Sequence, residues 1–109
     1  NKLQKKSEAI CNALDKYFGS SAEYKKPDGG IFVWVDMHKK VDTSRLYELA
    51  LKDGVAINPG NEWSINKSGR HKMRLCFGNP SIKEIDEGIK RLAIICRKEF
   101  GIPTKIANL

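Results

Sequence analysis

Apolar residues recur at helical spacing in three separate segments of this chain. The first segment covers residues 1–18, the second starts at Asp42 and stops before Gly54, and the third starts at Ser81. Asp42 is suited to cap a helix, and Ser81 with Glu84 forms the sequence pattern of a capping box. A glycine such as Gly54 readily takes the left-handed conformation that ends a helix. The pattern therefore predicts three helices, of which the third runs for about four turns.

Short runs of β-branched and aromatic residues stand between these helices. Residues 31–37 form the most strand-like run, and a strong turn signal at residues 27–30 joins them to an extended piece at 22–26. We expect these two pieces to form a hairpin. Two further strands are predicted at residues 55–57 and 73–77.

The order helix, strand, strand, helix, strand, strand, helix predicts an α/β fold, built as an α+β two-layer sandwich. Its small sheet would be mostly antiparallel, with the helices on one face. At 109 residues, the chain (1–109) is expected to be a single domain. The first helix begins without a cap and without an initiating methionine. Residues 1–18 are therefore interpreted as the truncated end of a connecting helix in a larger protein.

Composition and charge limit the kinds of partner and site. A hydrophobic content of 40% and a charged content of 30% are typical of a folded chain in water, and no apolar run approaches the roughly 20 residues that cross a bilayer. The net charge of +7 comes without a helix-turn-helix, zinc or RNA-binding pattern, which favours a solvated lysine-rich surface over a nucleic-acid site. Cys11, Cys76 and Cys96 lie in apolar segments, which predicts reduced core thiols in a cytoplasmic protein. The spacing of cysteines and histidines predicts no metal site.

Arg74 stands out because it lies inside the otherwise apolar run at residues 73–77. A guanidinium stays charged in proteins and is rarely buried without a partner. Arg74 therefore points outward from an edge strand, pairs with a neighbouring acid, or binds an anion. Its planar fork of donors suits a carboxylate, which it can hold by two parallel hydrogen bonds. The arginine by itself leaves these alternatives open.

Three short blocks stand in a definite order along the chain. The first is a Pro-x-Gly-Gly turn at residues 27–30 with the strand that follows it, and the second is a Gly-Val-x-x-x-Pro-Gly pattern at residues 54–60. The third is an Arg-Leu strand at Arg74 that runs into the helix starting at Ser81. Together they resemble the C-terminal small domain of fold-type I, pyridoxal-phosphate-dependent aminotransferases of class I/II.

Within that family, two subgroups match equally well. One contains aminotransferases of the aminoadipate and kynurenine type. The other contains GntR-family regulators of the MocR type, in which a winged-helix DNA-binding domain is fused to an aminotransferase-like body. The chain is therefore interpreted first as part of an enzyme, and alternatively as the effector domain of a transcriptional regulator.

The resemblance implies that the larger protein transfers an amino group between an amino acid and a 2-oxo acid, with pyridoxal 5'-phosphate as cofactor. It gives Arg74 the role of binding the α-carboxylate of the substrate, and it places Ile31 and Phe32 near the substrate side chain. It also implies a cytoplasmic homodimer without a membrane partner. Nucleic acid is an expected partner only if the protein is a GntR-type regulator.

The resemblance also implies what this chain lacks. In the family, a Schiff-base lysine, an aspartate on the pyridine nitrogen and a phosphate cup belong to a large domain. None of the 15 lysines here follows the serine-rich pattern of the Schiff-base lysine. We therefore expect no catalytic, cofactor-binding or metal-binding residue in this chain, and no transaminase activity from the chain alone.

Overall fold

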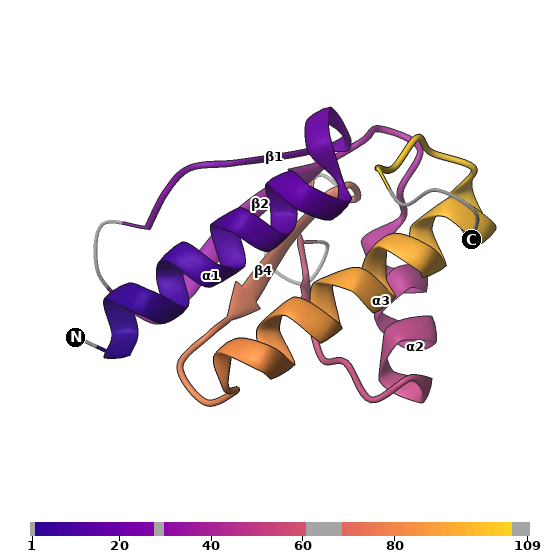
Figure 1. The fold of residues 1–109 in the computed structure, drawn as a ribbon. Helices are drawn as coiled ribbons and strands as arrows, with labels where there is room; N and C mark the ends of the chain where they lie inside the picture. The colour runs from indigo at the N-terminus through magenta and orange to yellow at the C-terminus, as the bar shows by residue number, and fades with distance from the viewer. Residues whose placement is uncertain (1, 28–29, 61–68, 106–109) are drawn as a thin grey trace.

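The computed structural model describes residues 2–27, 30–60 and 69–105 (Figure 1). In this part of the chain the helices are α1 (Lys2–Tyr17), α2 (Thr43–Lys52) and α3 (Ile82–Phe100), and a short 3-10 turn, η1 (Gly19–Ser21), follows α1. The strands are β1 (Ala22–Tyr24), β2 (Phe32–Met37), β3 (Asn58–Pro59) and β4 (Lys72–Cys76). This element order agrees with the prediction from the hydrophobic pattern. The tip of the predicted turn, Asp28 and Gly29, and most of the second inter-strand loop, 61–68, lie outside the described residues.

The four strands form one sheet in the order β1-β2-β4-β3, and each neighbouring pair is antiparallel. The hairpin predicted for residues 22–37 is confirmed by the β1–β2 pairing, in which Ala22 lies opposite Met37. Strand β4 has a partner on both sides, so it is a central strand. The edge position that one alternative gave Arg74 is therefore wrong, whereas a side chain that points outward is compatible with a central strand.

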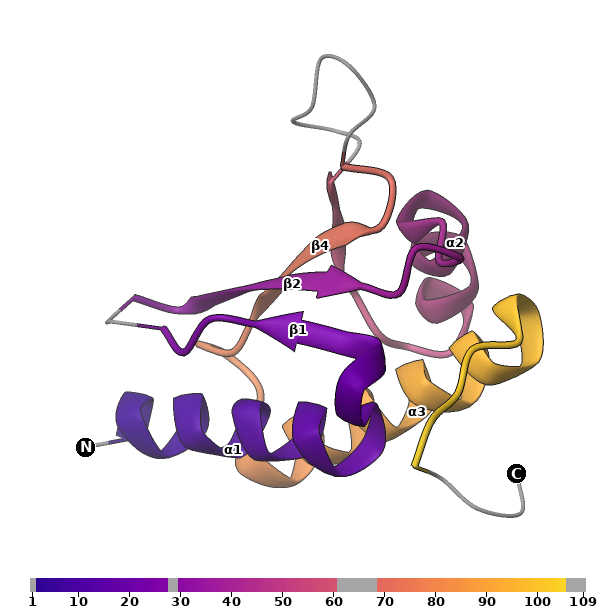
Figure 2. The same cartoon turned by 90° about the horizontal axis from the view of Figure 1, so that it is seen from above.

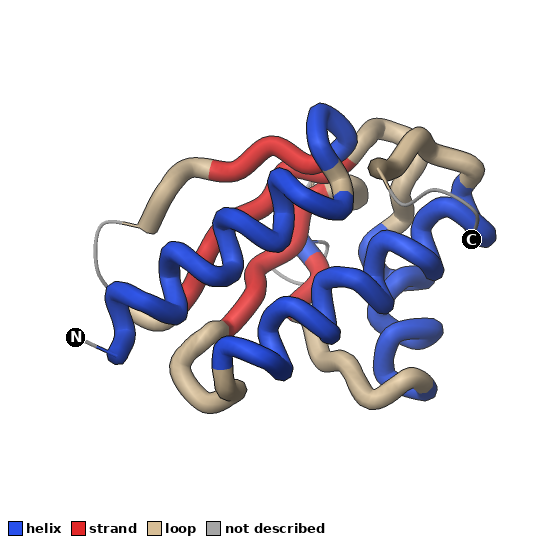
Figure 3. The backbone as a smooth tube through the Cα atoms, viewed as in Figure 1, coloured by secondary structure: helices blue, strands red, loops and turns tan. Residues whose placement is uncertain are grey.

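The helices are arranged in a second layer. α1 and α3 lie side by side across one face of the sheet, and α2 packs against α3 next to β3 (Figures 2 and 3). Apolar side chains from both layers form one core. Its largest fully buried members include Phe18, Phe77, Leu14, Leu46, Met73 and Leu92. The predicted two-layer α/β sandwich with helices on one face is confirmed.

Local signals set the ends of α2 and α3. The Asp42 carboxylate accepts hydrogen bonds from the N–H groups of Ser44 and Arg45, as expected of an N-cap. At α3, the Ser81 hydroxyl accepts from the Glu84 N–H at 3.1 Å, and the Glu84 carboxylate accepts from the Ser81 N–H at 3.0 Å. The capping box read from the sequence is thus present in full.

The end of α2 explains why residues 55–57 do not form the predicted strand. The Val55 N–H donates to the Ala50 carbonyl at 2.8 Å, and the Gly54 N–H donates to the Leu51 carbonyl at 3.1 Å, with Gly54 at φ 81°. These two bonds are a Schellman motif, in which the residue after the glycine still belongs to the helix end. The strand predicted at residues 55–57 is therefore wrong, and pairing begins only at Asn58.

The three cysteines are free thiols but do not share one environment. Cys11 and Cys96 are buried, whereas Cys76 is half-buried on the sheet face away from the helices, so its predicted core position is wrong. Burial raises the pKa of Cys96 to about 12, and burial together with the Asp15 charge raises the pKa of Cys11. Only a thiolate reacts with an alkylating reagent.

We therefore predict that iodoacetamide at pH 8 modifies Cys76 first in the folded chain, and that Cys96 reacts only after the chain is unfolded in urea. Peptide mass spectrometry at successive times measures the three rates separately. Equal rates for Cys76 and Cys96 under native conditions would show that Cys96 is not enclosed as described.

Candidate anion-binding site

Arg74 projects from the sheet face that carries no helix, which we call the open face. Along β4, Met73 and Leu75 are buried beneath the helices, and Arg74 between them is half-buried on the opposite side. Successive side chains of a strand point to opposite faces, so this alternation assigns the guanidinium to the open face. The charge therefore lies outside the hydrophobic core.

Two residues flank Arg74 across the sheet. Trp34 on β2 and Asn58 on β3 are its direct partners, so Trp34, Arg74 and Asn58 form a row on the open face. The Cβ atoms of direct partners in antiparallel strands are about 5 Å apart. Neither Trp34 nor Asn58 was predicted to belong to the site. The alternation of residues 31–37 could have placed Trp34 on the same sheet face as Phe32. Asn58 was missed because the third strand was predicted at residues 55–57, which end before it.

The guanidinium of Arg74 lies over aromatic rings of β2. Its Cζ atom is 4.1 Å from the centroid of the Phe32 ring and 5.5 Å from that of the Trp34 ring. Both distances fall within the range of cation–π attraction. Phe32, a predicted site residue, is thus brought to Arg74. Ile31 instead packs at the turn after β4, where a methyl group added to Gly78 would lie 3.0 Å from its Cγ2 atom.

Arg74 forms no ion pair with any acid in the described part of the chain. The nearest acid along β2, Asp36, lies 3.7 Å from the imidazole of His71 instead. Within the same residues, the Nε atom of Arg74 is covered from solvent and has no hydrogen-bond acceptor. The neighbouring-acid alternative thus has no support here. A ligand approaching the open face would meet the two terminal nitrogens of the fork.

Hydrogen bonds hold the backbone of β4 at both ends. Before the strand, the N–H and the hydroxyl of the buried Thr43 both donate to the Arg70 carbonyl, at 2.8 and 2.9 Å. After the strand, the Phe77 N–H donates to the Ile31 carbonyl at 2.8 Å. These bonds fix the stretch from which the Arg74 side chain projects.

Gly60 and Gly69 bring the ends of β3 and β4 into close contact. A methyl group added at Gly69 would lie 2.5 Å from the Gly60 carbonyl oxygen, closer than real contacts allow. We predict that Gly69→Ala destabilises the chain by about 1–3 kcal/mol, because the two backbones must separate. Urea denaturation measures the change. Gly88→Ala is the control: its methyl would meet only Val55 at 3.9 Å, and alanine favours a helix interior, so equal destabilisation by both variants would contradict the prediction.

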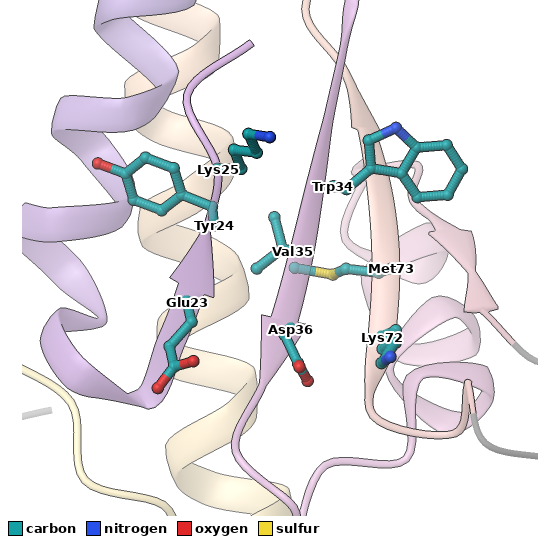
Figure 4. A pocket seen from close by; sticks show the side chains of 8 residues that line it. All are labelled: Glu23, Tyr24, Lys25, Trp34, Val35, Asp36, Lys72 and Met73. Carbon is teal, nitrogen blue, oxygen red and sulfur yellow. The ribbon is translucent and has the colours of Figure 1, made fainter.

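An open pocket of about 490 Å³ lies next to Trp34 but does not include Arg74 (Figure 4). It is lined by Glu23, Tyr24, Lys25, Trp34, Val35, Asp36, Lys72 and Met73. Glu23 and Asp36 are direct partners on β1 and β2, so two carboxylates stand side by side in its wall. Lys25 and Lys72 line the same pocket, so charges of both signs offset each other there and the pocket favours neither an anion nor a cation.

No helix among the described residues is long and apolar enough to cross a membrane. No group of three or more His, Cys, Asp or Glu side chains in these segments is placed to hold a metal ion.

Comparison with known proteins gave consistent matches. The sequence model of the family "Aminotransferase class I and II" matches residues 1–92. An uncharacterized aminotransferase of Saccharolobus solfataricus is 38% identical over 98 residues, which cover 90% of this chain and 24% of that protein. The uncharacterized HTH-type transcriptional regulator YisV of Bacillus subtilis is 32% identical over 97 residues, covering 89% of this chain and 20% of the regulator.

A solved structure agrees with these matches. LysN, the alpha-aminoadipate aminotransferase of Thermus thermophilus, complexed with N-(5'-phosphopyridoxyl)-L-leucine, superposes with a TM-score of 0.79 at 30% identity. The match covers 89% of this chain and 25% of LysN. The chain therefore spans between a fifth and a quarter of the length of these proteins.

Proposed function

Because this chain belongs to the aminotransferase class I and II family, we propose that it is the C-terminal small domain of a pyridoxal-phosphate-dependent aminotransferase. In this proposal the whole of 1–109 is that domain, and residues 1–18 are the end of a helix that connects it to a preceding large domain. The reaction is transfer of an amino group between an amino acid and a 2-oxo acid. Arg74 binds the α-carboxylate of the substrate.

The observation that carries the proposal is the state of Arg74 on the open face. Its guanidinium has no acidic partner within the described residues, and its Nε atom is covered there. Two terminal nitrogens, each carrying N–H groups in one plane, match the two oxygens of a carboxylate. A lysine would supply the charge but not the plane.

The contribution of Arg74 to the proposed reaction is to fix the plane of the substrate α-carboxylate. Pyridoxal phosphate, when bound, supplies the electron sink that amino-group transfer requires. Arg74 fixes the position and rotation of the amino acid, so that its Cα–H bond is held in the orientation in which it breaks. Orientation of this kind lowers a barrier without any covalent contact from the residue.

The described surroundings of Arg74 do not fit as a holder for the cofactor itself. A phosphate and an aldehyde call for several N–H donors and a lysine amine. Phe32, Trp34 and Asn58 flank Arg74 and offer two rings and one carboxamide, while Lys72, two residues earlier on β4, faces Asp36 across the strands. We therefore place the cofactor contacts in the large domain, and expect the chain alone to be inactive. A cytoplasmic homodimer stays a prediction of the family resemblance.

A regulator is the second candidate, because HTH-type regulators are among the relatives at 32% identity. In that case the same domain would belong to a body that senses an amino acid or pyridoxal phosphate, and a winged-helix segment would precede it. The sequence upstream of residue 1 distinguishes the two candidates directly.

The test is a half-reaction with the full-length protein. We expect that adding an amino-acid donor to the cofactor-loaded protein changes the visible absorbance of the cofactor and releases the matching 2-oxo acid. The 109-residue chain, titrated with pyridoxal phosphate alone, should give no stable absorbance band. Absence of any 2-oxo acid across the standard amino acids and 2-aminoadipate would contradict the enzyme and leave the regulator.

A further inference from the structure

The two rings beneath Arg74 differ in how much the fold needs them. Phe32 is half-buried, whereas the Trp34 side chain is 52% exposed on the open face. A tryptophan is costly to leave in water, because its large apolar surface gains nothing by exposure. Trp34 therefore contributes little to the hydrophobic core, and its contacts on the open face offer a better reason for a tryptophan at this position.

One contact of Trp34 is the guanidinium of Arg74. Trp34 is the direct cross-strand partner of Arg74, and its ring centroid lies 5.5 Å from the Arg74 Cζ atom. The Phe32 ring, two residues earlier on the same strand, lies at 4.1 Å. The charged end of the Arg74 side chain thus lies against two aromatic rings that project from the same face of β2. An arginine on an open sheet face would otherwise sample many rotamers.

We propose that Trp34 is a positioning residue for Arg74: with Phe32 it forms an aromatic platform that holds the guanidinium plane ready for a carboxylate. This inference rests on the proposed function, because it concerns the same arginine. It assigns Trp34 no contact with the reacting atoms. The attraction of a cation to a ring face restricts the guanidinium before the ligand arrives, so that less ordering is needed on binding.

The platform requires a ring face and not merely bulk. Trp34→Leu keeps an apolar side chain but removes the face, whereas Trp34→Phe keeps a smaller face. Since the side chain is half exposed, neither change opens a cavity in the core. Leu51→Ala, which alters a 53% exposed apolar residue on α2, is the control for removing surface apolar area away from Arg74.

The experiment measures carboxylate selectivity in the full-length, cofactor-loaded protein. Dissociation constants are determined for three pairs, each an amino acid and its α-carboxamide: L-glutamate and L-isoglutamine, L-leucine and L-leucinamide, L-phenylalanine and L-phenylalaninamide. For each pair, the dissociation constant of the amide is divided by that of the acid. This ratio isolates the contribution of the carboxylate, because the side chain is unchanged. A purely structural role for Trp34 would weaken both members alike and leave the ratio as it was.

We expect Trp34→Leu to lower this ratio about three- to tenfold, as cation–π attractions of ordinary size allow. Trp34→Phe should recover much of the loss, and Leu51→Ala should have no effect. An unchanged ratio in Trp34→Leu, with Arg74→Lys lowering it strongly, would overturn the platform and leave the proposed function intact. An unchanged ratio in Arg74→Lys, or no binding of any pair by the wild-type protein, would contradict the proposed function and this inference with it.

Discussion

Replacing Arg74 by lysine in the full-length protein is expected to raise the dissociation constant of the amino-acid substrate about 10- to 100-fold. The variant keeps the positive charge but replaces a two-point, coplanar grip with a single ammonium, and a charged hydrogen bond contributes roughly 1.5–3 kcal/mol. Arg74→Ala, which also removes the charge, should cost more. Substrate titration followed by cofactor absorbance measures the binding, and kcat/KM should fall at least in proportion.

The matched control is Arg70→Lys. Arg70 lies four residues before Arg74, its side chain is 64% exposed, and it is 3.9 Å from Asp42. Exposed ion pairs contribute little, so this change should leave substrate affinity within about twofold. Pyridoxal phosphate should remain bound in both variants. Equal substrate affinity in Arg74→Lys and wild type would refute the role assigned to Arg74.

Replacing Phe77 by alanine is expected to destabilise the folded chain by about 3–5 kcal/mol, a large share of the stability of a small domain. Phe77 is 1% exposed, and it closes the core where β4 ends. Its removal leaves a cavity between the sheet and the helices, because neighbouring side chains relax only in part. Urea denaturation of the chain should show a lower midpoint with a similar slope.

Leu51→Ala is also the control for Phe77→Ala, since it removes apolar atoms from an exposed site. Its effect should stay within about 0.5 kcal/mol. A similar midpoint shift for the two variants would mean that Phe77 is not packed as described. A strong loss of stability confined to Phe77→Ala would confirm that Phe77 fixes the end of β4, the strand that carries Arg74, against the core.

The sequence predicted what depends on neighbouring residues. Asp42 and the Ser81–Glu84 pair satisfy N–H groups within one turn of themselves, so their helices could be located from the sequence alone. The hairpin of residues 22–37 was equally local. The third strand was misplaced because pairing with β4 depends on distant residues. Pro59 is tolerated there because β3 is a short edge strand.

The candidate site divides in the same way. Arg74 could be singled out as a charge in an apolar run, and alternation alone puts Phe32 and Trp34 on one face of β2. The register of three strands decides that Trp34 lies directly beside Arg74 on the same sheet face. The same register places Asn58 on the other side of Arg74. Register is set by packing against α1 and α3, which no local pattern specifies.

The role of Arg74 is tested most directly by a crystal structure of the full-length, cofactor-loaded protein with a bound amino-acid substrate or an unreactive analogue. We expect two N–H···O contacts of roughly 2.7–3.2 Å between the terminal nitrogens of Arg74 and the ligand α-carboxylate, in one plane. A ligand whose carboxylate is held by another residue, with Arg74 out of hydrogen-bond range, would show that Arg74 is not the carboxylate-binding residue.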